Sequence, residues 1–90
     1  MSVEYIEAAN HLKGELKTFR ETLQCHPRDH TALQTAQRRL QTVIAQLEPL
    51  GEDPGEAWEC LSIEEKWGYV RLASFLGTAV HELRQLGINT

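Results

Sequence analysis

Apolar residues recur at alternating spacings of three and four through the middle of the chain. Such spacing places them on one face of an α-helix, because a helix completes a turn in about 3.6 residues. A stripe this regular is typical of a helix that packs against a partner helix. The stripe consists of Leu33, Ala36, Leu40, Val43, Leu47 and Leu50.

A second apolar stripe lies upstream and predicts a helix over residues 3–24. Between the stripes, residues 25–30 are polar and include Pro27, which disfavours helical backbone angles at the residue before it. We predict that the next helix begins at Thr31, with Gln34 as its capping-box partner, and that the two helices form an antiparallel hairpin over residues 3–48. The upstream stripe consists of Leu12, Leu16, Phe19 and Leu23.

Two further start signals follow the hairpin. Asp53 as a cap, with Pro54 after it, predicts a short helical turn over residues 54–60. Ser62 and Glu65 form a capping-box pattern and predict a third long helix over residues 63–86, with Gly87 as its stop. The sequence therefore predicts an all-α fold with three long helices and a short helical turn between the second and third.

The third helix carries more apolar surface than one neighbour needs, so we expect it to be central and to cover the hairpin. We predict that a homodimer buries the surplus, and the alternative is that the turn at Trp58 and the segment at Tyr5 fold over it within one chain. We expect Trp58 and Trp67 to pin the turn onto the core. The main stripe is Tyr69, Leu72, Leu76, Ala79, Leu83 and Leu86, with Val70, Ala73 and Val80 beside it. The residues predicted for self-association are Tyr69, Ala73, Phe75, Gly77 and Val80.

Length and composition favour a single helical domain over residues 1–90. Apolar residues make up 41% and charged residues 24% of the chain, which is ordinary for a globular domain. Its longest apolar run is much shorter than the roughly 20 residues that cross a bilayer, and it begins without a basic-then-apolar signal. We therefore expect a cytoplasmic protein with no membrane segment.

Charge is distributed unevenly within the net value of −4. Residues 48–65 hold seven acids and no base, whereas residues 13–39 hold six bases against three acids. Both regions can be solvated surface, or the acidic loop can dock on a basic protein partner. The net acidic charge argues against a nucleic-acid partner. The partner-binding residues predicted in the acidic loop are Glu52, Asp53, Glu56 and Glu59.

Candidate chemistry is sparse. Cys25, His26 and His30 lie close together in sequence, but the second ligand pair of a structural zinc site is missing unless Cys60 joins them, so metal binding stays open. No nucleophile is accompanied by a base and a glycine-rich loop, so we predict no enzyme activity and no cofactor.

The pattern thus favours a non-enzymatic interaction module, namely a small adaptor, inhibitor or regulatory protein that acts through its helical surfaces and acidic loop. Its protein partner cannot be named from the sequence. The alternative is binding of an anionic small ligand or nucleic acid through Arg28, Arg38 and Arg39.

Overall fold

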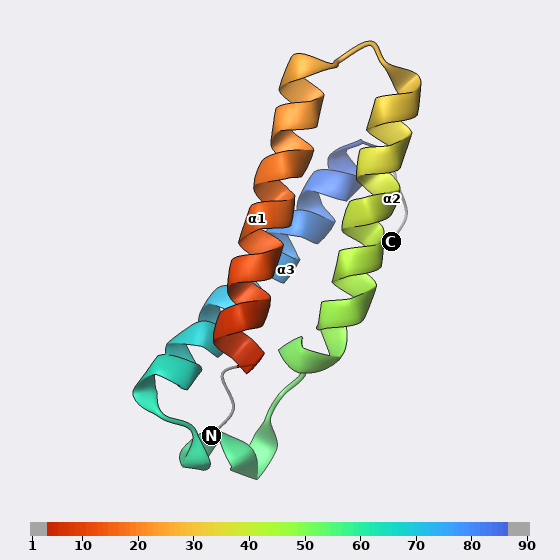
Figure 1. The fold of residues 1–90 in the computed structure, drawn as a ribbon. Helices are drawn as coiled ribbons and strands as arrows, with labels where there is room; N and C mark the ends of the chain where they lie inside the picture. Colours follow the sequence, from red (N-terminus) through yellow and green to blue (C-terminus); the bar gives the residue numbers. More distant parts are fainter. Residues whose placement is uncertain (1–3, 87–90) are drawn as a thin grey trace.

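The protein is all-α, with three long helices in an up-down-up arrangement (Figure 1). The computed structural model describes residues 4–86. Helix α1 spans Glu4–Cys25, α2 spans His30–Leu47 and α3 spans Ile63–Gln85. Two short 3-10 helices, η1 (Glu48–Gly51) and η2 (Gly55–Cys60), connect α2 to α3. The predicted fold class, hairpin and intervening turn are confirmed.

The start of α2 differs from the prediction. Asp29, rather than Thr31, is the N-cap: its backbone is extended, and its side chain accepts a hydrogen bond of 3.0 Å from the Ala32 amide. Aspartate is the stronger cap, because its carboxylate accepts from the free amides of the first turn and complements the helix dipole. Capping by Asp29 therefore lets the helix begin at His30, and the predicted Thr31–Gln34 box is wrong.

The start of α3 follows the prediction. The Ser62 hydroxyl accepts a hydrogen bond of 3.2 Å from the Glu65 amide, and the Glu65 carboxylate accepts from the Ser62 amide and hydroxyl. These bonds complete the capping box. In the preceding turn, Pro54 takes the N-cap position predicted for Asp53, whose carboxylate instead accepts from the Gly55 amide. Gly87, the predicted stop of α3, lies outside the described residues.

The core is built from all three long helices and takes residues from each predicted stripe, although Leu76 is half-buried and Leu86, the last residue of the α3 stripe, is exposed. Leu33, Leu47 and Leu50, toward the ends of the α2 stripe, are half-buried. Ile44, which was not assigned to the stripe, is buried beside Val43 and widens the packing face of α2. The buried apolar residues are Ala8, Ala9, Leu12, Leu16, Phe19, Leu40, Val43, Ile44, Leu72, Ala79 and Leu83.

Helix α3 runs parallel to α1 and packs mainly against it. Near the start of α3, a Cβ added at Gly68 would lie 2.9 Å from the Ile6 amide nitrogen, so the glycine allows a close backbone approach. Near its end, Glu82 accepts a hydrogen bond of 2.7 Å from Arg20. α3 touches α2 much less. The central helix is therefore α1, not the third helix as predicted. Helix α3 covers the hairpin from the α1 side.

The molecule is elongated, with principal extents of 47 × 21 × 16 Å. The turn between α1 and α2 lies at one narrow end, and the acidic connection through η1 and η2 lies at the other (Figure 1). None of the helices within residues 4–86 combines the length and apolar character needed to cross a bilayer.

Candidate interaction surface

The outward side of α3 carries a stripe of exposed residues that we call the outer stripe. It consists of Ile63, Trp67, Val70, Ser74, Gly77 and His81, all of which are exposed. Their spacing alternates between four and three, so they share one face. At about 100° per residue, this face lies opposite the side that buries Leu72 and Ala79.

The first half of the outer stripe is apolar and large. Ile63 is 69% exposed, Trp67 64% and Val70 47%. With Trp58 and Lys66, these three residues line an open hollow of about 290 Å³. We call these five residues the Trp67 patch.

The two tryptophans have different roles. Trp58 meets Tyr69 edge-on, with ring centroids 5.5 Å apart, and the Lys66 ammonium lies 5.6 Å from its ring centroid. Tyr69 in turn meets Tyr5 edge-on and donates a hydrogen bond to the Gly51 carbonyl. Trp58 therefore holds η2 against α3, as predicted. Trp67 is not buried against the core as predicted, because its side chain is 64% exposed and lines the outer wall of the same hollow.

The residues predicted for self-association do not form a single exposed face. Phe75 and Val80 are half-buried and pack against the core of their own chain, and Tyr69 is half-buried against Tyr5 and Trp58. Ala73 and Gly77 are exposed. The sequence reasoning missed Ile63 and Trp67, although their heptad spacing with Val70 was a readable signal of a second face.

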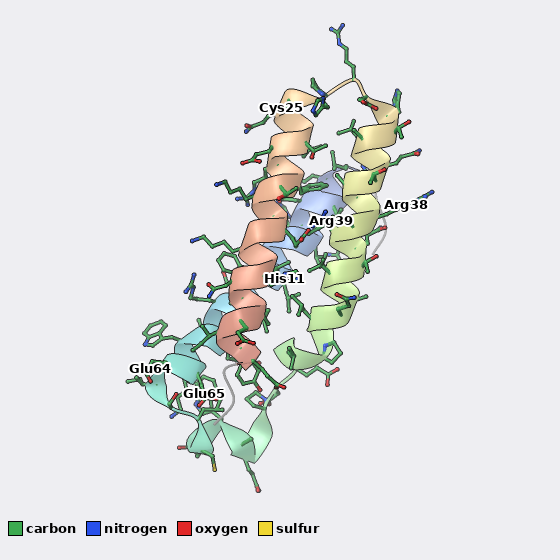
Figure 2. All side chains as sticks on the ribbon, viewed as in Figure 1. His11, Cys25, Arg38, Arg39, Glu64 and Glu65 are labelled. Carbon is green, nitrogen blue, oxygen red and sulfur yellow. The ribbon has the colours of Figure 1, made fainter. Side chains whose placement is uncertain are left out.

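The predicted acidic residues lie on the surface of the connection between α2 and α3, which also carries Trp58 of the Trp67 patch. Glu52, Asp53, Glu56 and Glu59 are all exposed, and the last two belong to η2 together with Trp58. Glu64 extends the acidic region into the first turn of α3 (Figure 2). A partner that reaches the apolar hollow would therefore meet negative charge at its border.

The predicted anion-binding arginines are dispersed. Arg28 lies in the hairpin turn, whereas Arg39 points toward α1 and Arg38 away from it (Figure 2). Arg39 donates hydrogen bonds of 2.7 and 2.9 Å to Glu15. These bonds, opposed by burial, hold the pKa of Glu15 below its ordinary value. Arg39 is already paired with a carboxylate and the three arginines do not share a site, so both observations weigh against the anion-binding alternative, which stays a prediction.

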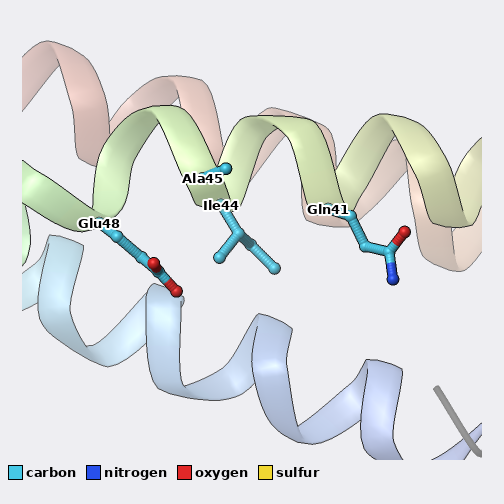
Figure 3. A pocket seen from close by; sticks show the side chains of 4 residues that line it. All are labelled: Gln41, Ile44, Ala45 and Glu48. Carbon is cyan, nitrogen blue, oxygen red and sulfur yellow. The ribbon is translucent and has the colours of Figure 1, made fainter. Parts of the chain in front are cut away.

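A second hollow, of about 290 Å³, opens between α2 and α3. Ile44 and Gln41 project from α2 toward α3, with Glu48 at one end (Figure 3). It has a single carboxylate and an otherwise neutral lining.

The candidate metal ligands are separated along the molecule. Cys25 lies near the hairpin turn and Cys60 lies in η2 at the opposite end, and both thiols are free and exposed. Across residues 4–86, no group of three or more His, Cys, Asp or Glu side chains is placed to hold a metal ion.

Comparison with models of protein families, with curated proteins and with solved structures finds no significant match to this chain.

Proposed function

We propose that the protein is a non-enzymatic interaction module of the cytoplasm that binds a protein through the Trp67 patch and the adjoining acidic residues. The observation that carries this proposal is the exposure of Ile63 and Trp67 on adjacent turns of α3. Contiguous apolar surface of this kind marks interaction sites in soluble proteins. Tryptophan is also enriched among the residues that dominate binding energy.

The surroundings of the patch support a protein partner. The contact between Trp58 and Tyr69 fixes one wall of the hollow in advance, which lowers the entropy cost of binding. The exposed carboxylates of Glu56, Glu59 and Glu64 border it with negative charge. Such charge raises the association rate for a basic partner and disfavours an acidic one.

A photocrosslinking side chain tests the patch directly. We would place it at Trp67 and, as a matched control, at Thr35, which is an exposed helical position in the half of α2 nearer the hairpin turn. In cells that produce the protein, we expect a discrete protein adduct from position 67 and none from position 35. Absence of an adduct at 67, or the same adducts at both positions, would contradict the proposal.

The acidic part of the proposal has its own test. Replacing Glu52, Asp53, Glu56 and Glu59 with lysine should reduce the yield of the adduct formed at position 67, because the replacement reverses the charge beside the patch. An unchanged yield would rule out acidic docking and leave the apolar contact in place.

A further inference from the structure

We propose that the outer stripe of α3 pairs with the outer stripe of a second copy of the chain, with the two α3 helices antiparallel. This rests on the apolar part of the proposed function, because it gives the same face of α3 a specific occupant, and it does not depend on docking by the acidic residues. The stripe is centred between Val70 and Ser74. A two-fold axis at that centre sets Trp67 of each copy against Gly77 of the other, with Ile63 facing His81.

The sizes of the side chains fit this register. The first half of the outer stripe presents Ile63, Trp67 and Val70, whereas the second half presents Ser74, Gly77 and His81. Pairing about the centre places Trp67 and Val70 of one helix over the small Gly77 and Ser74 of the other, as in knobs-into-holes packing. The two halves are thus complementary to each other, which is what a closed two-fold interface requires.

Within residues 4–86, no neighbouring atom requires a glycine at position 77. A Cβ added at Gly77 would meet nothing within 4 Å, whereas a Cβ at Gly68 or Gly51 would clash with Ile6 or Leu76. Glycine is also unfavourable in the middle of a helix. In the proposed pair, the absent side chain at Gly77 leaves room for the indole of Trp67 from the second copy.

The distribution of charge favours the antiparallel orientation. Residues 48–65 hold seven acids and no base, but residues 66–86 hold Lys66, Arg71 and Arg84 against one acid, Glu82, which is paired with Arg20. Antiparallel helices place the acidic segments of the two copies at opposite ends of the pair. A parallel pair would instead place the two acidic ends side by side.

Arg71 is the one cation near the centre of the proposed pair. Its guanidinium lies 5.8 Å from the centroid of the Phe75 ring in its own chain. This cation–π contact keeps the guanidinium beside its own helix, so the charge does not have to project into the interface.

Measurement of mass against concentration tests the pairing. For the wild type we expect a mass that rises from 10.2 kDa toward twice that value with increasing concentration. Gly77→Leu and Trp67→Ser should each weaken self-association at least about tenfold, because each spoils the knob-and-hole contact. Gly14→Leu is the matched control: Gly14 is also a helix-interior glycine with open space around it, so its replacement should leave the dimer constant unchanged. Circular dichroism confirms that each variant is folded.

Cysteine pairing tests the orientation. In a Cys25→Ser, Cys60→Ser background, we would prepare Ile63→Cys and His81→Cys as separate proteins. An antiparallel pair predicts disulfide-linked dimers when the two proteins are mixed and none from either alone, because position 63 faces position 81 of the other copy. Linkage within each separate protein would indicate a parallel pair and would overturn the proposed register, as would a failure to link in the mixture.

The outcomes separate this inference from the proposed function. A constant mass of 10.2 kDa up to about 1 mM, well above the range of weak specific dimers, would overturn the pairing. A dimer insensitive to Gly77→Leu would also overturn it, since the contact would then lie elsewhere. In either case, an adduct with a different protein at position 67 would leave the proposed function standing. An adduct that contains two copies of this chain would support both.

Discussion

At the scale of single residues, helix-interior glycines differ in what surrounds them. Gly68 lies where a Cβ would clash with the backbone of Ile6 in α1, and Gly14 lies in open space on α1. The same substitution at the two positions should therefore have opposite effects on stability.

We expect Gly68→Ala to lower the free energy of unfolding by about 1 kcal/mol or more, because the added Cβ would force apart Ile6 and α3. Gly14→Ala should raise it by up to about 1 kcal/mol, since only helix propensity changes there. Urea denaturation of both variants measures the difference. An equal increase at both positions would show that α1 and α3 do not approach closely at Gly68.

The ion pair between Glu15 and Arg39 predicts a dependence of stability on pH. The pKa of Glu15 is lower in the folded protein than its ordinary value, chiefly because it accepts hydrogen bonds from Arg39. A group whose pKa is lowered by folding stabilises the protein above its unfolded pKa, and this contribution is lost as the pH falls through the folded pKa. Part of the interaction is screened, because the Arg39 side chain is 64% exposed.

Arg39→Met should therefore reduce the free energy of unfolding at neutral pH, and the reduction should diminish as the pH falls through the folded pKa of Glu15, because protonation removes the charge with which Arg39 pairs. Arg38→Met is the control, since Arg38 is equally cationic but makes no ion pair within the described residues. Urea titrations at a series of pH values give the comparison. A difference that persists unchanged in acid would mean that Arg39 acts through packing instead.

At the scale of the helix, the α3 cap is the strongest local signal in the chain. Ser62→Ala removes the hydroxyl that accepts from the Glu65 amide and leaves the nearly buried Glu65 carboxylate with fewer donors. We expect Ser62→Ala to lower the free energy of unfolding by about 1 kcal/mol, within the range known for N-caps. The control is Thr42→Ala, which removes an exposed hydroxyl from the interior of α2 and should not lower stability, because alanine is the better helix former. Chemical denaturation measures both, and equal effects would refute a special role for the cap.

The three long helices could be predicted from the sequence because their stripes and breaks agree locally: Leu12 to Phe19, the Pro27 turn and the Ser62 box each act within a few residues. The packing of α3 mainly against α1, rather than equally over both helices of the hairpin, could not be predicted in the same way. It depends on the contact of Gly68 with Ile6, which are distant in sequence and give no periodic signal. The exposure of Trp67 follows from the same packing, because only the orientation of α3 decides which of its apolar faces is covered.

At the scale of the whole molecule, burial is concentrated away from the hairpin turn. The last buried residue of α1 is Phe19 and the first of α2 is Leu40, so residues 20–39 contain no buried side chain. Local opening requires least free energy where few apolar contacts are lost. The half of the hairpin nearest the turn should therefore open without the rest of the protein.

Hydrogen exchange followed by mass spectrometry tests this expectation. Amides of residues 32–38 should exchange faster than those of residues 9–19 by a factor of about ten or more, which corresponds to about 1.4 kcal/mol in opening free energy. Residues 72–83 of α3, which contain three buried positions, serve as the protected reference. Equal protection of the two hairpin segments would show that the structure opens only as one unit.

The positions of the two thiols restrict the redox chemistry of the chain. Cys25 lies beside the hairpin turn and Cys60 lies in η2 at the other end of an elongated molecule, so they cannot approach to the Cα separation of under about 7 Å that a disulfide needs. Mild oxidation of the folded protein can therefore link only different copies. The same separation allows two dyes to be attached at the native cysteines. Energy transfer between the dyes would then report the distance between the two ends of the folded molecule.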